Sequence, residues 1–290
     1  MRWLVTGAGG MLGTDLRTVL AGRELTAHSR PDLDITRFPA VVEAVAGHDV
    51  VINAAAWTAV DDAETHEAEA FDVNAVGAAN VARACARTGA LLVHLSTDYV
   101  FDGHASQPYP EDTPMAPGSA YGRTKAAGEW AVRAEHEGGS LVVRTAWLYG
   151  QHGTNFVTTV LRLMREREVL HVVDDQSGQP TWSLDLAQRL VALVDTGAGP
   201  GTYHATSAGQ TTWYGFAQRI AELSGQDPQR IRPTTTSQFP RAAPRPAWSV
   251  LGHHGWARTA LGPMRPWDEA LSEAMPRMLA DQDSAAPSRA

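Results

Sequence analysis

The chain has 290 residues, 43% of them hydrophobic, and a formal net charge of −8, so it can bury a sizeable core and has no long basic run suited to nucleic acid. A single cysteine, Cys85, excludes an intrachain disulfide and fits a reducing compartment. Because no apolar stretch reaches the ~18 residues that span a membrane, we expect a cytoplasmic protein with no nucleic-acid or membrane partner.

The first half of the sequence alternates short apolar runs with segments of helical periodicity. The predicted strands are residues 2–6, 24–29, 49–56, 90–96 and 140–145. The predicted helices are residues 11–21, 38–47, 67–89 and 121–137, and a long polar loop covers residues 97–118. Buried strands that alternate with helices favour a parallel sheet covered on both faces. We therefore predict an α/β fold of the Rossmann type, with a doubly wound parallel sheet.

The pattern loosens after about residue 150. Helices are predicted at 154–166, 183–195, 212–225 and 266–279, with short strands at 169–173 and 202–204 and a Pro/Arg-rich stretch at 232–250. We interpret residues 1–150 as a dinucleotide-binding Rossmann domain. Residues 151–280 are interpreted as a smaller, mainly substrate-binding C-terminal lobe that is interleaved with this domain. Residues 281–290 are expected to form a disordered tail.

A glycine-rich turn connects the first predicted strand to the first predicted helix. The segment VTGAGGMLG places Gly7, Gly10 and Gly13 at this junction, with Met11 and Leu12 at the start of the helix. Glycines allow a tight turn, and the free N–H groups of a helix start favour a pyrophosphate. A purely structural turn would also use glycine, but the position at the first strand–helix junction predicts dinucleotide binding.

The end of the second strand bears on the choice of cofactor. An acid at this place would bind the ribose 2′-hydroxyl of NAD, whereas this sequence has Ser29 and Arg30. A hydroxyl and a guanidinium suit a 2′-phosphate, so we predict NADPH, with NADH as the alternative. Asp34 and Ile35, on the following turn, are expected to complete this end of the cofactor site. If Arg30 only caps a surface turn, the argument for NADPH loses its main residue.

Two segments carry groups suited to the reduction of a ketone. Thr97 and Asp98 follow the fourth strand, and the carboxyl ends of parallel strands face the ligand crevice. Tyr121 and Lys125 lie one turn apart at the start of a predicted helix, where such a pair also occurs without function. A phenol can protonate a carbonyl oxygen, and a nearby ammonium lowers its usual pKa of about 10. We predict Tyr121, Lys125 and Thr97 as catalytic residues, the first two also touching the cofactor.

Taken together, the motifs resemble the extended short-chain dehydrogenases/reductases and, more narrowly, the dTDP-4-dehydrorhamnose reductase family. The resemblance covers the chain to about residue 280 and is carried by VTGAGGMLG, DVVINAAAWTAVDDAE, VNAVGAANVA, LSTDYVFDG, YGRTKAAGE, VRTAWLYG and VVDDQSGQPTW. It implies NADPH-dependent reduction of the 4-keto group of dTDP-4-dehydro-L-rhamnose, with Tyr121 as proton donor. The implied partner is a dTDP-linked keto-deoxysugar, and a homodimer is one possible assembly.

The resemblance also assigns residues around the ligands. The implied substrate contacts are Thr97, Asp98, Trp147, Trp182 and Arg245. Trp147 would be an apolar wall near the sugar, and Arg245 would bind phosphate oxygens unless it is only a surface arginine. The implied cofactor contacts in NAAAWT are Ala55, Ala56 and Trp57, although relatives often have His at the last position. Some members bind magnesium near the place of Asp15, but Leu184 stands where a further acid is expected, so we predict no metal.

Three other functions are consistent with the same motifs. The first is a nucleotide-sugar epimerase or dehydratase, which the missing acid at the second strand disfavours. The second is a 4-ketoreductase for another nucleotide-activated deoxysugar, which the sequence leaves open. The third is a non-catalytic NADP-binding regulatory subunit, which the intact set of Thr97, Tyr121 and Lys125 disfavours.

Overall fold

The centre of the molecule is a six-stranded sheet, seen in a computed structural model that describes residues 1–285. The strand order is β10–β5–β4–β3–β1–β2, and every pairing is parallel. The strands are β1 (Arg2–Thr6), β2 (Glu24–His28), β3 (Val50–Asn53), β4 (Leu91–Thr97), β5 (Ser140–Thr145) and β10 (Gly201–His204). This topology confirms the predicted doubly wound α/β fold. The order reverses between β1 and β3, where such sheets open a crevice for ligands.

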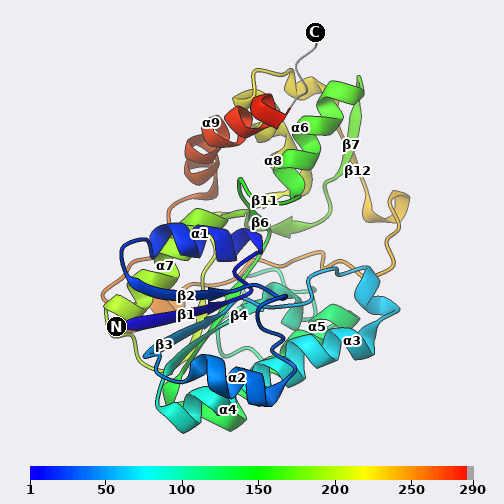
Figure 1. Ribbon diagram of the computed structural model, residues 1–290. Coiled ribbons are helices and arrows are strands. Elements are labelled where there is room, and N and C mark those ends of the chain that lie inside the picture. The colour runs from blue at the N-terminus through cyan, green and yellow to red at the C-terminus, as the bar shows by residue number, and fades with distance from the viewer. Residues whose placement is uncertain (286–290) are drawn as a thin grey trace.

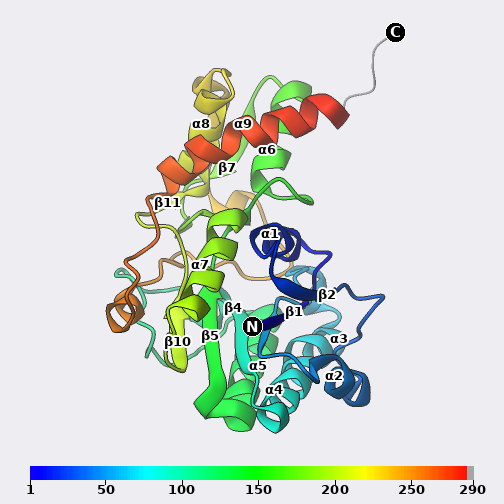
Figure 2. The ribbon, with the colours of Figure 1, turned by 60° about the vertical axis from the view of Figure 1, so that its left-hand side comes forward.

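Helices cover both faces of the sheet (Figure 1). On one face, α1 (Met11–Val19) and α7 (Ser183–Asp195) share an apolar core with the strands. On the other face lie α2 (Phe38–Val45), α4 (Ala78–Thr88) and α5 (Ala120–His136). Figure 2 shows α7 and β10 beside β5, so the second half of the chain supplies both a helix and a strand to the sheet layers.

The helix predicted over 67–89 is divided by a wider turn. It begins as α3 (Glu67–Phe71), continues as a π-helical turn at Asp72–Gly77 and ends as α4. Gly77 in this turn packs so closely on Ile35 that an added Cβ would lie 2.6 Å from the isoleucine Cδ1. Asn74 in the same turn is buried and points its amide toward the loop after β3. Wider turns of this kind are frequent at functional sites.

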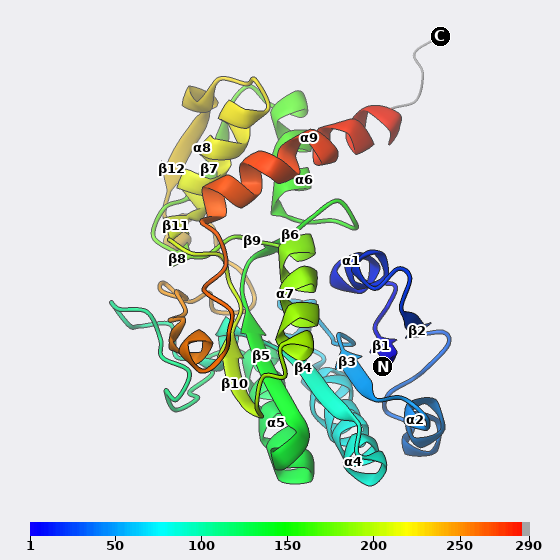
Figure 3. The ribbon, with the colours of Figure 1, turned by 90° about the vertical axis from the view of Figure 1, so that its left-hand side faces the viewer.

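The remaining elements form a lobe with its own apolar core (Figure 3). Its helices are α6 (Phe156–Glu166), α8 (Trp213–Leu223) and α9 (Trp267–Ala285). Three short strand pairs flank them: β6 (Leu148–Tyr149) with β9 (Thr181–Trp182), β7 (Leu170–Val173) with β12 (Ile231–Thr234), and β8 (Ser177–Gly178) with β11 (Thr211–Thr212). Short 3-10 turns lie at Asp62–Glu64, Asp98–Val100, Glu137–Gly139, Pro228–Arg230, Thr236–Gln238 and His254–Arg258.

The C-terminal end differs from the sequence expectation. Residues 281–285, expected to be disordered, are the last turns of α9, because neither glycine nor proline interrupts the chain there. Residues 286–290, the rest of the expected tail, lie outside the described residues. Within residues 1–285, no helix is both long and apolar enough to cross a membrane.

Candidate active site

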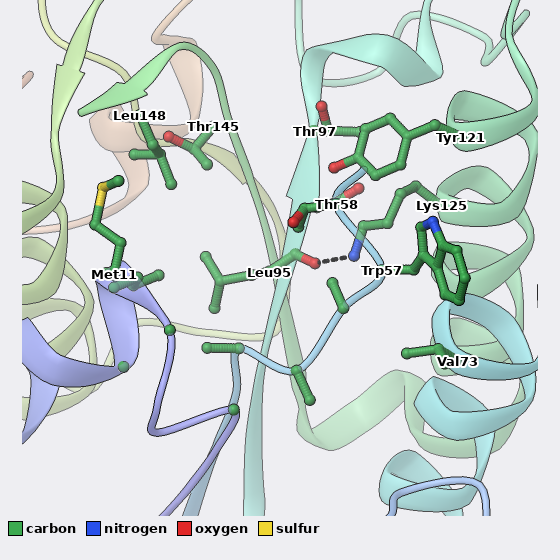
Figure 4. Close-up of a pocket in the computed structure, with 18 of the residues that line it drawn as sticks. Met11, Trp57, Thr58, Val73, Leu95, Thr97, Tyr121, Lys125, Thr145 and Leu148 are labelled. Atoms are coloured by element: carbon green, nitrogen blue, oxygen red, sulfur yellow. Dashed lines mark hydrogen bonds between the residues drawn. The ribbon is translucent and has the colours of Figure 1, made fainter. Parts of the chain in front are cut away.

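A cavity of about 820 Å³ opens at the carboxyl edge of the sheet. Its walls come from the turns after β1, β2, β3, β4 and β5, together with α5 and the start of α8. The predicted site residues that line it are Gly7, Gly10, Met11, Leu12, Gly13, Ser29, Arg30, Asp34, Ile35, Ala55, Ala56, Trp57, Thr97, Asp98, Tyr121, Lys125 and Trp147. Figure 4 shows Met11 and Leu148 on one side of this space and Tyr121, Lys125 and Trp57 on the other. The fold therefore brings the predicted cofactor and catalytic residues together.

The glycine turn after β1 approaches neighbouring backbone too closely for side chains. Gly7 has φ +72°, and a Cβ on it would lie 2.6 Å from the Ala54 carbonyl carbon. A Cβ on Gly13 would lie 2.3 Å from the Gly7 oxygen. Gly10 precedes α1 without a side-chain cap, so the N–H groups of the first helical turn have no side-chain partner at this position. This turn is suited to hold a pyrophosphate at a helix start.

The end of β2 carries the residues that bear on the ribose phosphate. The backbone N–H and hydroxyl of Ser29 donate to the Asp32 carboxylate at 2.9 and 2.5 Å, and these bonds hold the pKa of Asp32 below its usual value. Asp34 instead accepts from the Thr36 hydroxyl and N–H, which lower its pKa in the same way. The Arg30 side chain is exposed at the mouth of the cavity. The Asp32 and Asp34 carboxylates thus each accept hydrogen bonds from residues of their own loop.

Thr97 and Asp98 occupy the end of β4 as predicted from sequence. The Thr97 hydroxyl donates to the Asp98 carboxylate at 2.8 Å and accepts from the Tyr99 N–H at 3.2 Å. Asp98 is buried, and burial raises its pKa to about 6, although the Thr97 bond opposes this. A carboxyl group with this pKa changes charge near neutral pH, which makes it a candidate functional group.

Tyr121 lies in the first turn of α5, after the N-cap residue Ser119, whose hydroxyl accepts from the Gly122 N–H at 3.1 Å. Its phenol faces the cavity near Thr97 (Figure 4). Burial raises the pKa of Tyr121 above its ordinary value, and contact with Thr97 offsets part of this rise. The phenol is therefore in its protonated form at neutral pH.

Lys125 lies one turn further along α5 and is 2% exposed. Its ammonium donates to the Leu95 carbonyl at 2.6 Å, and burial lowers its pKa to about 8. The expectation that this ammonium lowers the pKa of Tyr121 is wrong for this arrangement. Lys125 is bonded to β4 rather than to the phenol, so the desolvation of Tyr121 dominates.

Two residues that support the site escaped the sequence prediction. The Asn74 carboxamide accepts from the Trp57 N–H at 2.8 Å and donates to the Trp57 carbonyl and to the Thr124 hydroxyl. It therefore ties the loop after β3 to the helix of Tyr121. The Thr145 hydroxyl lines the cavity and has no hydrogen-bond partner among residues 1–285. A hydroxyl at the carboxyl end of a buried strand was the available signal for Thr145.

A pair of tryptophans closes the cavity on the side of the C-terminal lobe. Trp147 stacks on Trp213 with ring centroids 3.6 Å apart and planes 9° apart, and both line the cavity. Trp147 also has φ +48°, the left-handed region that side chains other than glycine rarely adopt. Gly178 leaves room for its indole, because a Cβ there would lie 2.3 Å from Cε2. Trp213 was not predicted as a site residue, since an aromatic at a helix start is equally typical of a core.

Two predicted substrate contacts lie away from the cavity. Trp182 is 2% exposed in the core of the lobe, where the guanidinium groups of Arg265 and Arg277 lie 5.5 and 5.3 Å from its ring. Arg245 donates to the Asp61 carboxylate at 2.7 Å. Neither lines the cavity. The indole of Trp182 is enclosed by the lobe core, and its contact with the substrate stays a prediction.

Asp15, the acid considered for a metal, is buried and accepts a 2.5 Å hydrogen bond from the Ser183 hydroxyl. Burial raises its pKa, which this bond opposes. Within the described part of the chain, no three His, Cys, Asp or Glu side chains are grouped as metal ligands would be.

Comparisons with known proteins agree with this geometry. Residues 1–280 match the family model described as the RmlD substrate binding domain. A dTDP-4-dehydrorhamnose reductase of Streptomyces griseus is 50% identical over 96% of this chain and 94% of its own. A dTDP-4-keto-6-deoxy-D-glucose reductase of Streptomyces niveus is 48% identical over 97% and 99%.

The crystal structure of a dTDP-4-dehydrorhamnose reductase from Bacillus anthracis, in complex with NADP, superposes with a TM-score of 0.91. It is 38% identical and covers 95% of this chain and 99% of its own. The agreement extends over both the sheet and the lobe, so it concerns the whole architecture. The chain therefore belongs to the RmlD substrate binding domain family, the family of the dTDP-4-dehydrorhamnose reductases that its motifs resemble.

Proposed function

We propose that the protein catalyses the NADPH-dependent reduction of the 4-keto group of dTDP-4-dehydro-L-rhamnose to dTDP-L-rhamnose. One observation carries this proposal: a single cavity has a glycine turn at one end and Tyr121, Thr97 and Lys125 at the other. Family membership supports the reaction class, because relatives are named as reductases of dTDP-linked keto sugars. The NADP complex of the Bacillus anthracis relative supports the cofactor.

The cofactor would be held by groups that already surround the cavity. The glycine turn and the start of α1 would bind the pyrophosphate, and the exposed Arg30 guanidinium would face a 2′-phosphate. The Thr145 hydroxyl, which lacks a protein partner within residues 1–285, would bind a polar group of the cofactor. When bound, the reduced nicotinamide supplies a hydride to the carbonyl carbon.

Tyr121 is the proposed proton donor to the carbonyl oxygen. Because burial keeps its pKa high, the phenol carries its proton at neutral pH and can donate it. The neighbouring Thr97 hydroxyl would hold the same oxygen in position, and the Lys125 ammonium would bind the cofactor. The carbonyl carbon thus gains a hydride, the oxygen gains the Tyr121 proton, and a proton from solvent then restores the phenol.

The sugar would lie between Asp98 and the Trp147 indole, which presents an apolar face to the cavity. Arg245 stays a proposed partner of the substrate diphosphate. Its present partner is the Asp61 carboxylate, also approached by Arg241 at 3.8 Å and by the Ala243 N–H at 3.1 Å. The substrate diphosphate would accept the hydrogen bonds that Arg245 now donates to the Asp61 carboxylate.

A second candidate is the reduction of a different dTDP-linked keto-deoxysugar. The Streptomyces niveus relative is named for a D-sugar substrate and is 48% identical, close to the 50% of the Streptomyces griseus relative. Identity at this level therefore favours neither sugar. A regulatory, non-catalytic role is disfavoured by the intact Tyr121, Lys125 and Thr97.

The direct test offers dTDP-4-keto-L-rhamnose, generated from dTDP-glucose by a dehydratase and an epimerase, and follows NADPH oxidation at 340 nm. The product sugar is then identified by chromatography against dTDP-L-rhamnose. Turnover of dTDP-4-keto-6-deoxy-D-glucose before epimerisation would favour the second candidate. Folded protein that oxidises no NADPH with either sugar would contradict the proposed activity.

The role of Tyr121 is tested by Tyr121→Phe, with Tyr149→Phe as the matched control. Tyr149 is buried in the lobe core and its hydroxyl has no partner within the described residues, so its loss removes no bond. General acid catalysis contributes ~100- to 10,000-fold, so kcat should fall at least ~100-fold in Tyr121→Phe. Near-normal turnover would show that the proton comes from another group.

The cellular location and the oligomeric state of the protein stay predictions. A cytoplasmic location would be checked by fractionation of the source cells. A homodimer would be checked by sedimentation equilibrium. A single species with the mass of one chain, 31.1 kDa, would contradict it.

A further inference from the structure

A buried cluster of charges lies between the helix of Tyr121, α5, and the sheet, and its charged residues do not line the cavity. Glu129 is 0% exposed and receives two hydrogen bonds of 2.8 Å from the Arg144 guanidinium. The Ser96 hydroxyl donates to it at 2.6 Å and Arg133 at 2.7 Å. Burial raises the pKa of Glu129, but the bonds and charge of Arg144 more than reverse this, so the carboxylate is ionised. A charge buried this completely is costly unless it is fully paired, and this one is.

The cluster touches the catalytic residues through their immediate neighbours. Glu129 lies one helical turn after Lys125 on α5, and Lys125 donates to the carbonyl of Leu95. The Ser96 side chain that binds Glu129 is flanked by Leu95 and by Thr97. Two consecutive residues of β4 are therefore joined to two consecutive turns of α5. This double attachment fixes how the helix that carries Tyr121 lies against the strand that carries Thr97.

We propose that Glu129 is a positioning residue: its carboxylate, held by Arg144 and Ser96, fixes α5 against β4 and keeps the Lys125 ammonium charged. The proposal rests on the proposed reductase function, in which Lys125 acts as a cation. Arg144 is the necessary partner, because it neutralises Glu129 from β5. Its guanidinium is itself placed by the Glu111 carbonyl at 3.1 Å and by the face of Phe101, 4.9 Å from the ring centroid.

The protonation of Lys125 depends on the charges around it. The titratable and charged groups on the elements packed against it are Tyr121, Glu129 and Arg133 on α5, His94 on β4, Asp98 after β4, Arg144 on β5, His204 on β10, and Glu64 and Glu67 near the start of α5. Burial lowers the pKa of Lys125 to about 8, and the charge of Glu129 is what opposes this. Burial also keeps His94 and His204 neutral, since it lowers both of their pKa values.

The test uses opposite changes of charge at the same place. Glu129→Gln removes the negative charge and leaves two arginines, so the pKa of Lys125 should fall and the alkaline limb of kcat/KM should move to lower pH by about one unit. Arg144→Met removes a positive charge, so the same limb should move to higher pH. A merely structural role would lower activity in both variants without moving the limb in opposite directions. Glu129→Asp, which keeps the charge, should restore the wild-type position of the limb.

Burying an unpaired charge can prevent folding, so the double variant Glu129→Gln/Arg144→Met is included. It differs from Arg144→Met only in the charge of Glu129, and its alkaline limb should lie at lower pH than that of the single variant. Glu135→Gln is the matched control, since this glutamate lies on the same helix but pairs with Arg83 at the surface. The alkaline limb of Glu135→Gln should coincide with that of the wild type. Coincident limbs in Arg144→Met and the double variant would overturn the proposal.

A second readout separates this proposal from the proposed function. The dissociation constant of NADPH is measured against pH by cofactor fluorescence, which requires no sugar substrate. If wild-type protein reduces neither keto sugar, the proposed function fails, and the NADPH titration still tests the charge of Lys125. The pH at which NADPH affinity declines should shift in the same order as the variants above. A pH profile of binding that is identical in all variants would overturn the role of Glu129.

Discussion

Gly178→Ala should displace the Trp147 indole and weaken the binding of the sugar alone. An added Cβ would lie 2.3 Å from Cε2 and 2.5 Å from Cζ2 of Trp147, while ordinary contact begins at 3.4 Å. The ring must therefore move by about 1 Å, and Trp213, stacked on its face at 3.6 Å, restricts where it can go. Gly178 has an ordinary backbone angle, so the methyl group introduces no backbone strain of its own.

The magnitude follows from the cost of overpacking. An extra methyl in a filled space costs ~1–3 kcal/mol, and displacing one of two stacked aromatic rings loses ~0.5–1.5 kcal/mol. If about 1.4 kcal/mol of this appears in the sugar complex, KM for the keto sugar rises about tenfold. The dissociation constant of NADPH should stay within twofold, because the indole of Trp147 packs on Gly178 and Trp213 and not on the glycines of the turn after β1.

The assay is NADPH oxidation against sugar concentration, with cofactor binding followed by fluorescence and stability by urea unfolding. Gly138→Ala is the matched control, because nothing lies within 4 Å of the Cβ it would add. An unchanged KM in Gly178→Ala, with stability equal to that of the control, would refute the placement of Trp147 beside the sugar. A loss of NADPH affinity equal to the loss of sugar affinity would show that the whole cavity had distorted.

Three further outcomes follow from the geometry of the site. Gly13→Ala would place a Cβ 2.3 Å from the Gly7 oxygen, so NADPH affinity should fall at least ~10-fold, as fluorescence titration would detect. Thr145→Val removes a hydroxyl without a partner in the described chain, so urea unfolding should show no loss of stability while NADPH binds about five- to tenfold more weakly; equal affinity would count against the cofactor contact. Asp98 has its pKa raised to about 6, so its contribution to folding stability should decrease by ~2–3 kcal/mol as pH rises from about 4 to 6, and urea unfolding at successive pH values should show this difference between the wild type and Asp98→Asn.

The sign of the Asp98 effect depends on which state binds the proton more tightly. Between about pH 4 and 6 the folded protein holds a proton on Asp98 that the unfolded chain has released. The contribution of Asp98 to stability is therefore highest below this range and declines through it, the reverse of the usual behaviour of a paired aspartate. Stability of the wild type that rose over this interval and was unaffected by Asp98→Asn would contradict the buried position.

The architecture and the cavity walls were largely predictable, because they depend on local patterns. Continuous apolar runs separated by helical segments indicate a parallel sheet, and glycines at the first strand–helix junction indicate a tight turn, which lines the cavity. The strand β12 was not predicted, since Pro233 within it argues against a central strand. The proline is tolerated there because β12 pairs along one side only, with β7.

Partners that are distant in the sequence account for the rest. Trp182 looked like a sugar contact, but its burial depends on Arg265 and Arg277, which arrive more than eighty residues later in the chain. The pKa directions of Tyr121 and Lys125 depend on how deeply α5 is buried, which no local pattern records. Spacing predicted that these two residues share a cavity, but it could not predict that the ammonium binds a carbonyl of β4.

The late origin of β10 bears on how the chain is synthesised. Residues 1–150 contain five strands of the sheet but neither β10 nor α7, which cover the outer side of β5 and one apolar face. Roughly fifty more residues must leave the ribosome before β10 can pair, which takes several seconds at ~5–20 residues per second. During that interval the nascent chain exposes an unpaired strand edge, which can pair with the strands of other chains.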